Sequence, residues 1–488
     1  MMGHQSDYQH KLFITDFNLE KRIPKNHILR KISEKIDFDF IYKEVDNTYG
    51  PNGNVSVPPP IILKLMLLLF LYKVPSEREL MNTLPVRLDW LWFLGYDLED
   101  DIPNHSVLSK VRARWGVDAF KKFFELILWQ CVEAGLVDGC KSFVDSSLID
   151  ADASNNSVVN TQSLKKYLKK SYRRLEGRLD DIKEQKTTPA NNQYMSTTDP
   201  DASVIRRGKG RSKLRYKTHR AVDEKHEVIT ATKITTGSVD DGEIIGEIID
   251  LHEQNTQSKI DTVVADTKYG SVDNYLHCHD KGIEAHIPSI EASNRGSGRR
   301  KGIFPKEKFI FNPDTDTFIC PAGEVLTRQK YKKKRSHFEY KASSKACNNC
   351  NLKDKCTRSK FGRTLKRHVR QDDLDAMVKC ARSKESKKNL RTRKHLSERS
   401  FARATQYGYK RARWRNLWRM EIQDYLIAAI QNIKVLINQP KPTMSKSNVE
   451  ECRKPGSQCL KMLINCCYTR LKIFIKPDLL FPHYLCNS

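Results

Sequence analysis

Hydrophobic positions in the first third of the chain follow the period of an α-helix. Residues 1–57 are polar and mixed without a firm period, which predicts a polar N-terminal arm. Three prolines then open a strongly apolar segment, and Ser76 with Glu79 forms a capping box, a pair that satisfies free amides at a helix start. Residues 120–131 repeat apolar side chains every three to four positions. Residues 58–138 are therefore predicted to form a helical domain. Its core is expected to hold Trp90, Trp92, Phe93 and Trp115.

After residue 138 the pattern changes to short apolar runs, typical of β-strands, separated by amphipathic segments. The predicted order is strand, helix, two strands, helix, strand, helix and strand. In that order, the elements cover residues 142–145, 164–182, 214–223, 226–235, 240–253, 261–265, 272–280 and 284–287. Sequential strands followed by alternating helices and strands predict a mixed α/β sheet covered by helices over residues 139–288.

Three further segments follow the predicted sheet. Residues 289–385 are expected to form a basic, cysteine-containing insertion, and residues 386–438 have the pattern of final helices. Residues 439–488 hold five cysteines without a clear hydrophobic pattern. They are expected to be an atypical C-terminal tail.

The charge of the chain indicates a polyanionic partner. Lys and Arg number 86 against 59 Asp and Glu, which gives a formal net charge of +27. Such an excess repels itself in a compact protein unless an anion lies against it, and nucleic acid is the commonest such anion. A basic protein without this partner and an anionic membrane surface are the alternatives. The most apolar run, residues 61–72, is too short to cross a bilayer.

Four of the thirteen cysteines have the spacing of metal ligands. Cys320, Cys347, Cys350 and Cys356 are separated by 26, 2 and 5 residues, which predicts a structural four-thiolate Zn²⁺ site. Free cysteines are the alternative. The odd number of cysteines and the polar start of the chain, which lacks the apolar core of a secretory signal, favour a reduced, cytoplasmic protein.

Two carboxylates follow apolar strands. Asp145 and Asp266 each end such a run, and adjacent strands lie only about 4.8 Å apart. Cleavage of a phosphodiester can use two divalent ions roughly 4 Å apart, held by hard oxygen ligands. The two aspartates are therefore candidates for such a site, and a turn or helix cap is the alternative for each.

Residues 391–419 combine basic and aromatic side chains. The segment has ten Lys or Arg residues and a single acid, Glu398. Basic side chains suit phosphates and aromatic rings suit unpaired bases, whereas a solvated helix face with inward aromatics is the alternative. Trp418 is expected to pack inward. The residues expected to contact DNA are Lys394, Arg399, Arg411, Arg413, Arg415, His219 and Arg220. For His219 and Arg220, a structural hydrogen bond is the alternative.

Several long stretches of the chain are distinctive. The first is LLLFLYKVPSERELMNTLPVRLDWLWFLGYDLEDDIPNHSVLSKVRARWG. The others are FVDSSLIDADAS, STTDPDASVIRRGKGRSKLRYKTHRAVDEKHEVITATKITTG, VVADTKYGS, HLSERSFARATQYGYKRARWR and AAIQNIKVL. In this order they resemble bacterial insertion-sequence transposases of the IS-eleven-eighty-two-like group, over most of residues 58–437. Together these motifs are highly specific, whereas a piece such as ADT alone is not.

The resemblance implies a ribonuclease H-like α/β catalytic domain with an Asp-Asp-Glu triad. Matched motif by motif, the triad falls on Asp145 in FVDSS, Asp266 in VVADTKYG and Glu398 in LSERSF. The resemblance implies that these carboxylates hold two Mg²⁺ or Mn²⁺ ions. Asp150 and Asp152 are rivals of Asp145 and are expected in the next turn or strand. Glu421 is the nearest rival of Glu398.

The resemblance also implies a reaction and partners. A transposase of this kind binds the terminal inverted repeats of its insertion sequence, cleaves the DNA strands and transfers them to target DNA. Its partners are therefore double-stranded DNA and further copies of itself, in a homodimer or a larger assembly. The expected location is the bacterial cytoplasm at the nucleoid, without a membrane.

The chain departs from the family pattern near Glu398. Related transposases commonly carry Tyr, Arg and Lys where this chain has Arg391, Lys394 and Thr405, and the ending after Asn438 also differs. Thr405 and this ending favour an alternative function, a transposase-derived protein that binds DNA without cutting it. The three intact carboxylates argue against this alternative. A nuclease on the same fold, which would hydrolyse DNA ends without joining them, is the other alternative.

Overall fold

The structure is a computed structural model that describes Met2 and residues 18–52, 54–160, 193–206, 208, 210–290 and 302–438. The chain divides into two units, Met1–Ile437 and Asn438–Ser488, and the description below concerns the first. The predicted helix at 164–182 and the predicted tail at 439–488 lie outside the described residues.

Among the described residues, eight α-helices precede the sheet in sequence. They are α1 (Leu19–Arg22), α2 (Ile28–Lys35), α3 (Phe40–Val45), α4 (Pro59–Leu71), α5 (Glu77–Thr83), α6 (Leu88–Leu94), α7 (Ser106–Trp115) and α8 (Asp118–Glu133). Prolines can start α4 because the first amides of a helix have no partner within it. The Ser76 hydroxyl accepts from the Glu79 amide at 3.1 Å and caps α5. Trp90 and Trp115 are buried in the core, as predicted.

Residues 28–45 also belong to the helical core, which differs from the polar arm expected for residues 1–57. Leu29, Ile32 and Ile41 are buried in the same hydrophobic cluster as the apolar side chains of α4 and α8. The apolar positions lie on one face of each short helix. Because each helix is at most eight residues long, too few turns repeat for the period to stand out in the sequence.

A six-stranded sheet forms the centre of the α/β region. Its strands are β1 (Lys141–Asp150), β4 (Ser203–Ile205), β5 (Lys213–Asp223), β6 (Ile229–Thr236), β7 (Thr262–Val264) and β8 (Glu284–His286). Strand β5 pairs antiparallel with β1, β4 and β6, whereas β7 pairs parallel with both β1 and β8. This is a mixed sheet, as the hydrophobic pattern predicts. A separate two-stranded sheet is formed by β2 (Val158–Asn160) and β3 (Tyr194–Ser196).

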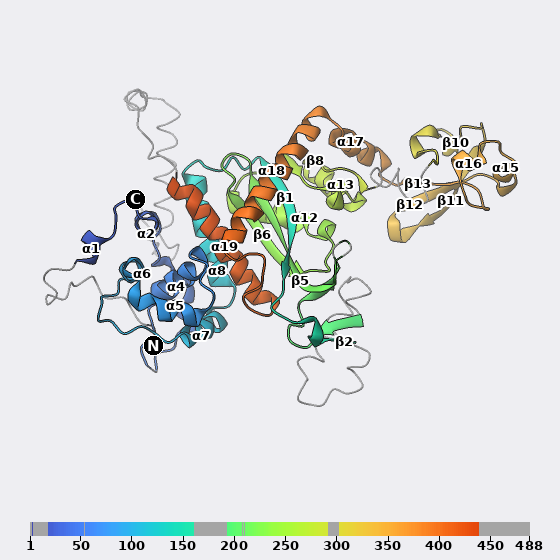
Figure 1. Ribbon diagram of the computed structural model, residues 1–488. Helices are drawn as coiled ribbons and strands as arrows, with labels where there is room; N and C mark the ends of the chain where they lie inside the picture. Colours follow the sequence, from blue (N-terminus) through green and yellow to red (C-terminus); the bar gives the residue numbers. More distant parts are fainter. Residues whose placement is uncertain are drawn as a thin grey trace, which may run out of the picture. The chain divides into compact units, whose positions relative to one another are not determined.

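Helices pack against both faces of the six-stranded sheet (Figure 1). They are α12 (Ile245–Thr256), α13 (Val272–Lys281), α17 (Gln371–Ala381), α18 (Lys384–Gln406) and α19 (Leu417–Asn438). Val144 and its ladder partner Ala221 share a hydrophobic cluster with α12, α13 and α17. On the opposite face, Phe143 and Val264 pack against Leu396 of α18. Side chains of a strand alternate between its faces, so Asp145, two residues after Phe143, also faces α18.

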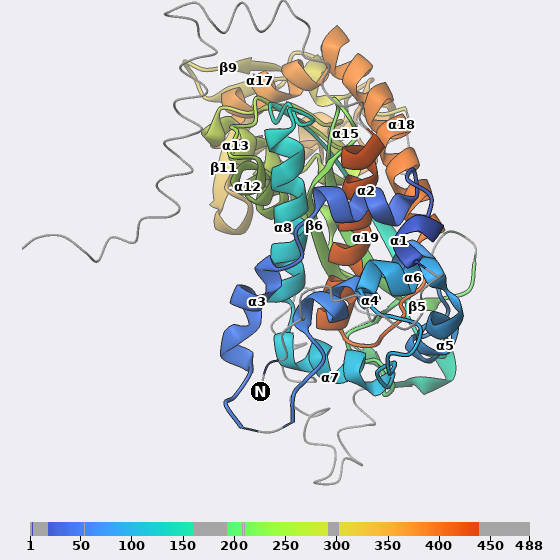
Figure 2. The same ribbon diagram turned by 90° about the vertical axis from the view of Figure 1, so that its left-hand side faces the viewer.

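Helix α19 connects the helical region to the sheet. It lies beside α8, with the rings of Tyr425 and Phe124 at 5.8 Å between centroids (Figure 2). On its other side, the Asn432 amide exchanges two 2.8 Å hydrogen bonds with the backbone of Ile229 on β6. The N-terminal helices, α19 and one face of the sheet therefore share one hydrophobic core.

A second sheet lies in the cysteine-containing segment. Its antiparallel strands are β9 (Ile310–Asn312), β10 (Thr317–Ile319), β11 (Val325–Lys332), β12 (His337–Lys341) and β13 (Thr364–His368). Phe309, Phe318 and Tyr340 contribute to a small hydrophobic core of its own. Two short helices, α15 (Ser344–Asn348) and α16 (Lys353–Cys356), lie between β12 and β13 in sequence.

Two elements differ in extent from the sequence prediction. Strand β1 continues past Asp145 to Asp150, because β5 pairs with it residue by residue as far as Asp150 and Arg215. Asp145 therefore lies inside a strand and not at its end. The expected final helical region is divided into α18 and α19 by residues 407–416. Gly408, with a φ of 80°, takes the left-handed conformation that commonly follows a helix end.

Candidate active site

Asp145 lies within β1, and Asp266 follows the end of β7, the parallel strand beside it. Phe143 of β1 pairs with Val264, the last residue of β7, so Asp145 and Asp266 each lie two residues beyond this pair, and the charge of Asp266 acts on Asp145. Because Phe143 packs against α18 and the side chains of a strand alternate, the Asp145 carboxylate projects from that face of the sheet. The spacing of adjacent strands, about 4.8 Å, suits two carboxylates that share cations.

Asp145 is a partly buried carboxylate, 24% exposed, with a cation against it. Burial raises its pKa, and the charge of Asp266 raises that pKa further. The charge of Arg393 lowers it, with the guanidinium Nη1 lying 2.8 Å from Asp145 Oδ2, and a hydrogen bond from Ser397 acts in the same direction. Arg393 and Ser397 are four residues apart and therefore share one face of α18. The surroundings of Asp145 favour a positive charge beside it.

Asp266 starts a short 3-10 helix, Thr267–Tyr269, after the end of β7. Its Oδ1 accepts a 3.0 Å hydrogen bond from the Lys268 amide, so one carboxylate oxygen has the capping role considered as an alternative for this residue. The side chain of Lys268 extends to Asp241, 2.9 Å away, and is 66% exposed. This places a solvent-accessible cation beside the two aspartates.

A buried polar layer lies behind this 3-10 helix. His219 is within 3.4 Å of the Tyr269 hydroxyl through Nδ1 and 3.1 Å of the Thr235 hydroxyl through Nε2. Burial lowers the pKa of His219 to about 4, so the ring is neutral at pH 7. Asp241 is also buried and lies 3.0 Å from the ammonium of Lys217. These contacts fix the segment that carries Asp266.

Glu398 lies on α18, one residue after Ser397, and its side chain is exposed. Among the described residues, the carboxylate oxygens of Asp145, Asp266 and Glu398 do not all lie within 4.8 Å of one another. The structure therefore places Asp145 and Asp266 on or just after the adjacent strands β1 and β7, and Glu398 on the helix that packs over this part of the sheet, without a three-carboxylate cluster among the described residues.

The rival acids have other partners. Asp150 lies 2.8 Å from both Lys213 and Arg215, and Asp152 forms ion pairs with two arginines of the segment between α18 and α19. Burial raises the pKa of Glu421, which lies in α19 near Lys233 and away from α18's contact with Asp145. Asp145 therefore differs from Asp150 and Asp152 in its burial and in its carboxylate neighbour.

The prediction that His219 and Arg220 contact DNA is wrong, because both side chains are buried, at 0% and 1% exposure. Arg220 donates to Asp424 at 2.7 Å and to Gln431 at 2.9 Å, so it fastens α19 to the sheet. The Asp424 carboxylate also accepts hydrogen bonds from threonines of β5 and β6. The alternative, a structural hydrogen bond, is the correct one for both residues.

The basic residues between α18 and α19 do not share one role. Arg411 and Arg415 are 74% and 50% exposed. Arg413, in contrast, points inward: it donates to the backbone oxygens of Val74 and Pro75 at 2.6 and 3.0 Å. This contradicts the expected contact of Arg413 with DNA. On α18 itself, the other two expected contacts, Lys394 and Arg399, are exposed.

The four predicted zinc ligands converge on one pocket of the second sheet. Cys320, Cys347, Cys350 and Cys356 all line it. The backbone amide two residues after Cys320, and the one two residues after Cys350, donate to the respective sulfurs at 3.4 Å. Among the described residues, no three of the sulfurs lie within 4.8 Å of one another. Four sulfurs on one zinc are about 3.8 Å apart, so the loops would have to close slightly around an ion.

A basic surface on β11 was not anticipated from the sequence. Along this strand and the turn after it, the side chains of Lys330, Lys332, Lys333 and Arg335 are exposed. The signal is present as the run RQKYKKKR at residues 328–335, inside the segment expected to be basic. The run alone does not show that these cations follow one exposed strand of a separate sheet.

Comparison with known protein families gives two matches. Residues 17–114 match the family described as "Transposase domain (DUF772)", and residues 319–437 match the family described as "Transposase DDE domain". The second match includes Glu398, whereas Asp145 and Asp266 lie between the two matched segments. No curated protein and no solved structure matches the chain. Among the described residues, no helix has the length and apolar character to cross a membrane.

Proposed function

We propose that this protein, which is a DNA transposase of the DDE type, cleaves and joins DNA strands at a site formed by Asp145, Asp266 and Glu398. The observation that carries this proposal is that Asp145 contacts Arg393 of α18 and feels the charge of Asp266, which follows the strand paired with β1. The DDE family implies phosphodiester cleavage and strand transfer that depend on a divalent metal. The residues that carry the reaction are our assignment.

The residues around Asp145 fit a divalent cation. The donor set consists of carboxylate oxygens, which Mg²⁺ and Mn²⁺ prefer, and Arg393 already holds a positive charge against one oxygen of Asp145. Asp145, Asp266 and Glu398 would hold two such ions. When bound, the ions would supply an activated water or 3′-hydroxyl and would stabilise charge on the leaving oxygen.

The neighbouring side chains of this chain position the carboxylates and neutralise phosphate. Ser397 and Arg393 orient the carboxylate of Asp145 through direct contacts. The hydrogen bonds of Tyr269 and His219 hold the segment that carries Asp266. Lys268, exposed beside both aspartates, is suited to contact a phosphate of bound DNA.

The arrangement of the sheet supports a ribonuclease H-like catalytic domain. Its strands follow the order β6, β5, β1, β7, β8, with β5 antiparallel to its neighbours and the last three strands parallel. The aspartates lie on or next to β1 and β7, and the glutamate on a late helix. We assign the cysteine-containing second sheet to an insertion before that helix, in a transposase of the IS-eleven-eighty-two-like group.

The DNA surface that we assign is formed by exposed cations. Lys394 and Arg399 lie on α18 next to Glu398, and Arg411 and Arg415 follow the same helix. The basic strand β11 carries further exposed cations on the second sheet, and we assign these to DNA binding as well. Such contacts are largely independent of base sequence, so they suit the terminal inverted repeats and the target DNA alike. The two ends of the element must be bound and cut in one complex, which favours a homodimer or a larger assembly on DNA.

The test is metal-dependent nicking of DNA that carries the element's own inverted repeat. Asp145→Asn and Asp266→Asn should each abolish nicking while retaining DNA binding, because each removes a charged oxygen ligand and almost no volume. Asp150→Asn is the matched control, since Asp150 lies on the same strand in ion pairs with Lys213 and Arg215. Normal cutting by either of the first two variants would refute the assignment.

We also infer a structural zinc ion at Cys320, Cys347, Cys350 and Cys356. Thiolates in one pocket, with amide donors to two of the sulfurs, fit a closed four-ligand zinc site that has no catalytic position. Cys347→Ser combined with Cys350→Ser should remove about one zinc per chain and expose residues 302–368 to proteolysis before the rest. Cys140→Ser, at an exposed cysteine outside this pocket, is the control. Unchanged zinc content in the double variant would exclude this site.

A further inference from the structure

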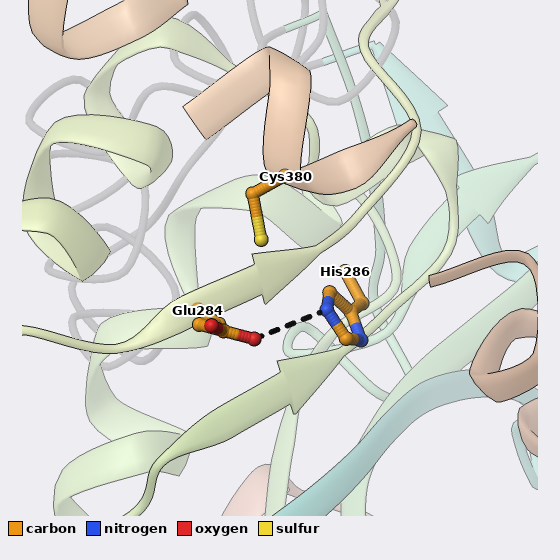
Figure 3. A group of neighbouring side chains, drawn as sticks. All are labelled: Glu284, His286 and Cys380. Carbon is orange, nitrogen blue, oxygen red and sulfur yellow. Dashed lines mark ion pairs between the residues drawn. The ribbon is translucent and has the colours of Figure 1, made fainter. Parts of the chain in front are cut away.

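Three side chains outside both sites described above converge from two elements (Figure 3). Glu284 and His286 are alternate residues of β8, at the end of the sheet, and Cys380 reaches down to them from α17. One oxygen, one nitrogen and one sulfur atom of these residues all lie within 4.8 Å of one another. Such a group combines three of the side-chain types that bind transition metals in proteins.

The imidazole of His286 is held in place by α18. Its side chain is 1% exposed, and its Nδ1 lies 2.8 Å from the Asn389 amide group, while Nε2 faces the Glu284 carboxylate at 3.4 Å. Metal-binding histidines are usually held in this way through the second ring nitrogen. If Asn389 presents its oxygen to a proton on Nδ1, the lone pair of Nε2 is free for an ion. Asn389 presents its oxygen in this way when its side-chain amide group is turned by 180°. The turn breaks the 3.5 Å hydrogen bond that Lys141 donates to the Asn389 oxygen.

The group is surrounded by acids and one cation, Lys141, and is open to solvent on one side. The charge of Glu385, at the start of α18, acts on both His286 and Cys380, so a fourth oxygen ligand lies nearby. Glu284 is 61% exposed, which gives an ion a path from solvent. Nitrogen, sulfur and oxygen ligands together favour Zn²⁺ over Mg²⁺, which prefers oxygen alone.

We propose that Glu284, His286 and Cys380 bind a zinc-type divalent ion, with Glu385 or a water molecule as the fourth ligand. The ion would fasten α17 and the start of α18 to β8. It differs from the carboxylate site in position as well as in chemistry. His286 pairs with Val264, the last residue of β7, whereas Asp266 lies two residues beyond the end of that strand.

The function of such an ion follows from the helix that it would hold. Asn389, which contacts His286, is one turn before Arg393, and Arg393 contacts Asp145. A metal at the start of α18 would therefore fix the helix that carries Arg393, Ser397 and Glu398 relative to the sheet. The site would be structural, and it does not depend on which acids carry out the DNA chemistry.

The experiment measures metal binding by purified full-length protein loaded with Co²⁺ or Zn²⁺ and then dialysed. It uses the Cys347→Ser, Cys350→Ser background, which removes the thiolate site of the second sheet. We expect about one remaining ion per chain, and with Co²⁺ the near-ultraviolet absorption of a thiolate–cobalt bond. Adding Cys380→Ser should abolish both signals, whereas adding Cys140→Ser at an exposed cysteine should leave them unchanged.

A second measurement guards against loss of structure in these variants. In the otherwise unaltered chain, Glu284→Gln replaces a side chain that is 61% exposed, so the metal-free protein should melt at the same temperature as the wild type. Added Zn²⁺ should raise the melting temperature of the wild type more than that of Glu284→Gln. The proposal is overturned if the background variant shows no thiolate–cobalt absorption, if Cys380→Ser retains it, or if Zn²⁺ stabilises Glu284→Gln fully.

Discussion

The guanidinium beside Asp145 comes from a residue that the family pattern does not specify. The pattern has Arg at the position of Lys394, but Lys394 is exposed, and Arg393 makes the ion pair with Asp145. A one-residue step rotates a helical side chain by about 100°, so only one of the two can face the sheet. Arg393 thus supplies the fork-shaped donor that the lysine lacks.

Glu398 is the acid whose role is most open to a direct test. Glu398→Gln should abolish metal-dependent nicking of an end-containing DNA and leave DNA binding near the wild-type level, because the change removes a charged ligand and keeps the shape. Its exposure means that the melting temperature should hardly change. Cleavage by purified variants, with binding and melting measured in parallel, checks these expectations.

Glu421→Gln is the control for Glu398. Glu421 lies on α19, and burial raises its pKa, so its neutral replacement should be tolerated and cleavage should stay near normal. If Glu398→Gln cuts normally while Glu421→Gln does not, the third acid of the site is Glu421. The match between α18 and the family's last catalytic helix would then have to shift.

His219 should make the stability of the metal-free protein dependent on pH. Its pKa is lowered to about 4 by burial, whereas in the unfolded chain it is about 6.5. As the pH falls from about 6.5 to about 4, the unfolded state takes up a proton that the folded state does not, so stability falls through this window. The loss has an upper limit of about 3 kcal/mol.

The measurement is chemical denaturation of the wild type and of His219→Gln at pH 7 and pH 5. Gln keeps a hydrogen-bonding side chain but cannot titrate, so its stability should fall less between the two pH values. His252, also buried with a lowered pKa, is present in both proteins and cancels in the comparison. Equal losses in the two proteins would show that His219 does not carry this dependence.

In the segment between α18 and α19, neighbouring arginines have different roles: Arg413 packs inward, whereas Arg411 and Arg415 are exposed. Arg413→Ala should lower the melting temperature, because it removes two hydrogen bonds to backbone oxygens and a guanidinium stacked 5.0 Å from the Phe70 ring centroid. The expected loss is roughly 2–3 kcal/mol. Arg411→Ala and Arg415→Ala should weaken DNA binding and leave melting nearly unchanged. Calorimetry and DNA titration of the three variants separate these outcomes, and a stable Arg413→Ala would contradict the buried role.

Helices and strands could be predicted where their hydrophobic pattern lies within the element's own sequence. The β5–β6 hairpin and the helices at α12 and α13 were found because alternation and helical spacing are properties of the sequence itself. The extent of β1 past Asp145 was not, because polar residues 145–147 stay in the strand only through pairing with β5. The structural role of Arg220 likewise depends on a tertiary contact, because its partner Asp424 is 204 residues away in the sequence.

The STTDPDAS motif gives a similar case, since its role is visible only in three dimensions. Asp199 and Asp201 accept hydrogen bonds from the amides of Asn416 and Leu417 at 3.1 and 2.8 Å, and so cap α19 from a distant part of the chain. The adjacent strands β1 and β7, which lead to Asp145 and Asp266, could be anticipated from two apolar runs. The group formed by Glu284, His286 and Cys380 could not be anticipated, because no sequence spacing links strand β8 to helix α17.

At the scale of the whole molecule, the excess of positive charge should determine how DNA is held. The net charge of +27 predicts binding that persists when divalent metal is removed, because phosphate contacts supply most of the affinity. If six or more phosphates are neutralised, affinity should fall by about three orders of magnitude or more between about 50 and 200 mM salt. Titration of end-containing DNA at several salt concentrations, with a chelator present, measures this slope. A nearly flat dependence would contradict the assigned DNA surface.

The basic strand β11 should account for part of that slope. Changing Lys330, Lys332 and Lys333 together to Gln removes three exposed cations from the second sheet, which should reduce the logarithmic salt slope by up to about 0.9 for each phosphate that is no longer neutralised. The matched control changes three exposed lysines elsewhere, Lys225, Lys259 and Lys379, and lowers the net charge equally. If charge acts only through the overall field, both triple variants will weaken binding alike. A larger reduction of the slope in the β11 variant is the result expected if this strand contacts the DNA backbone directly.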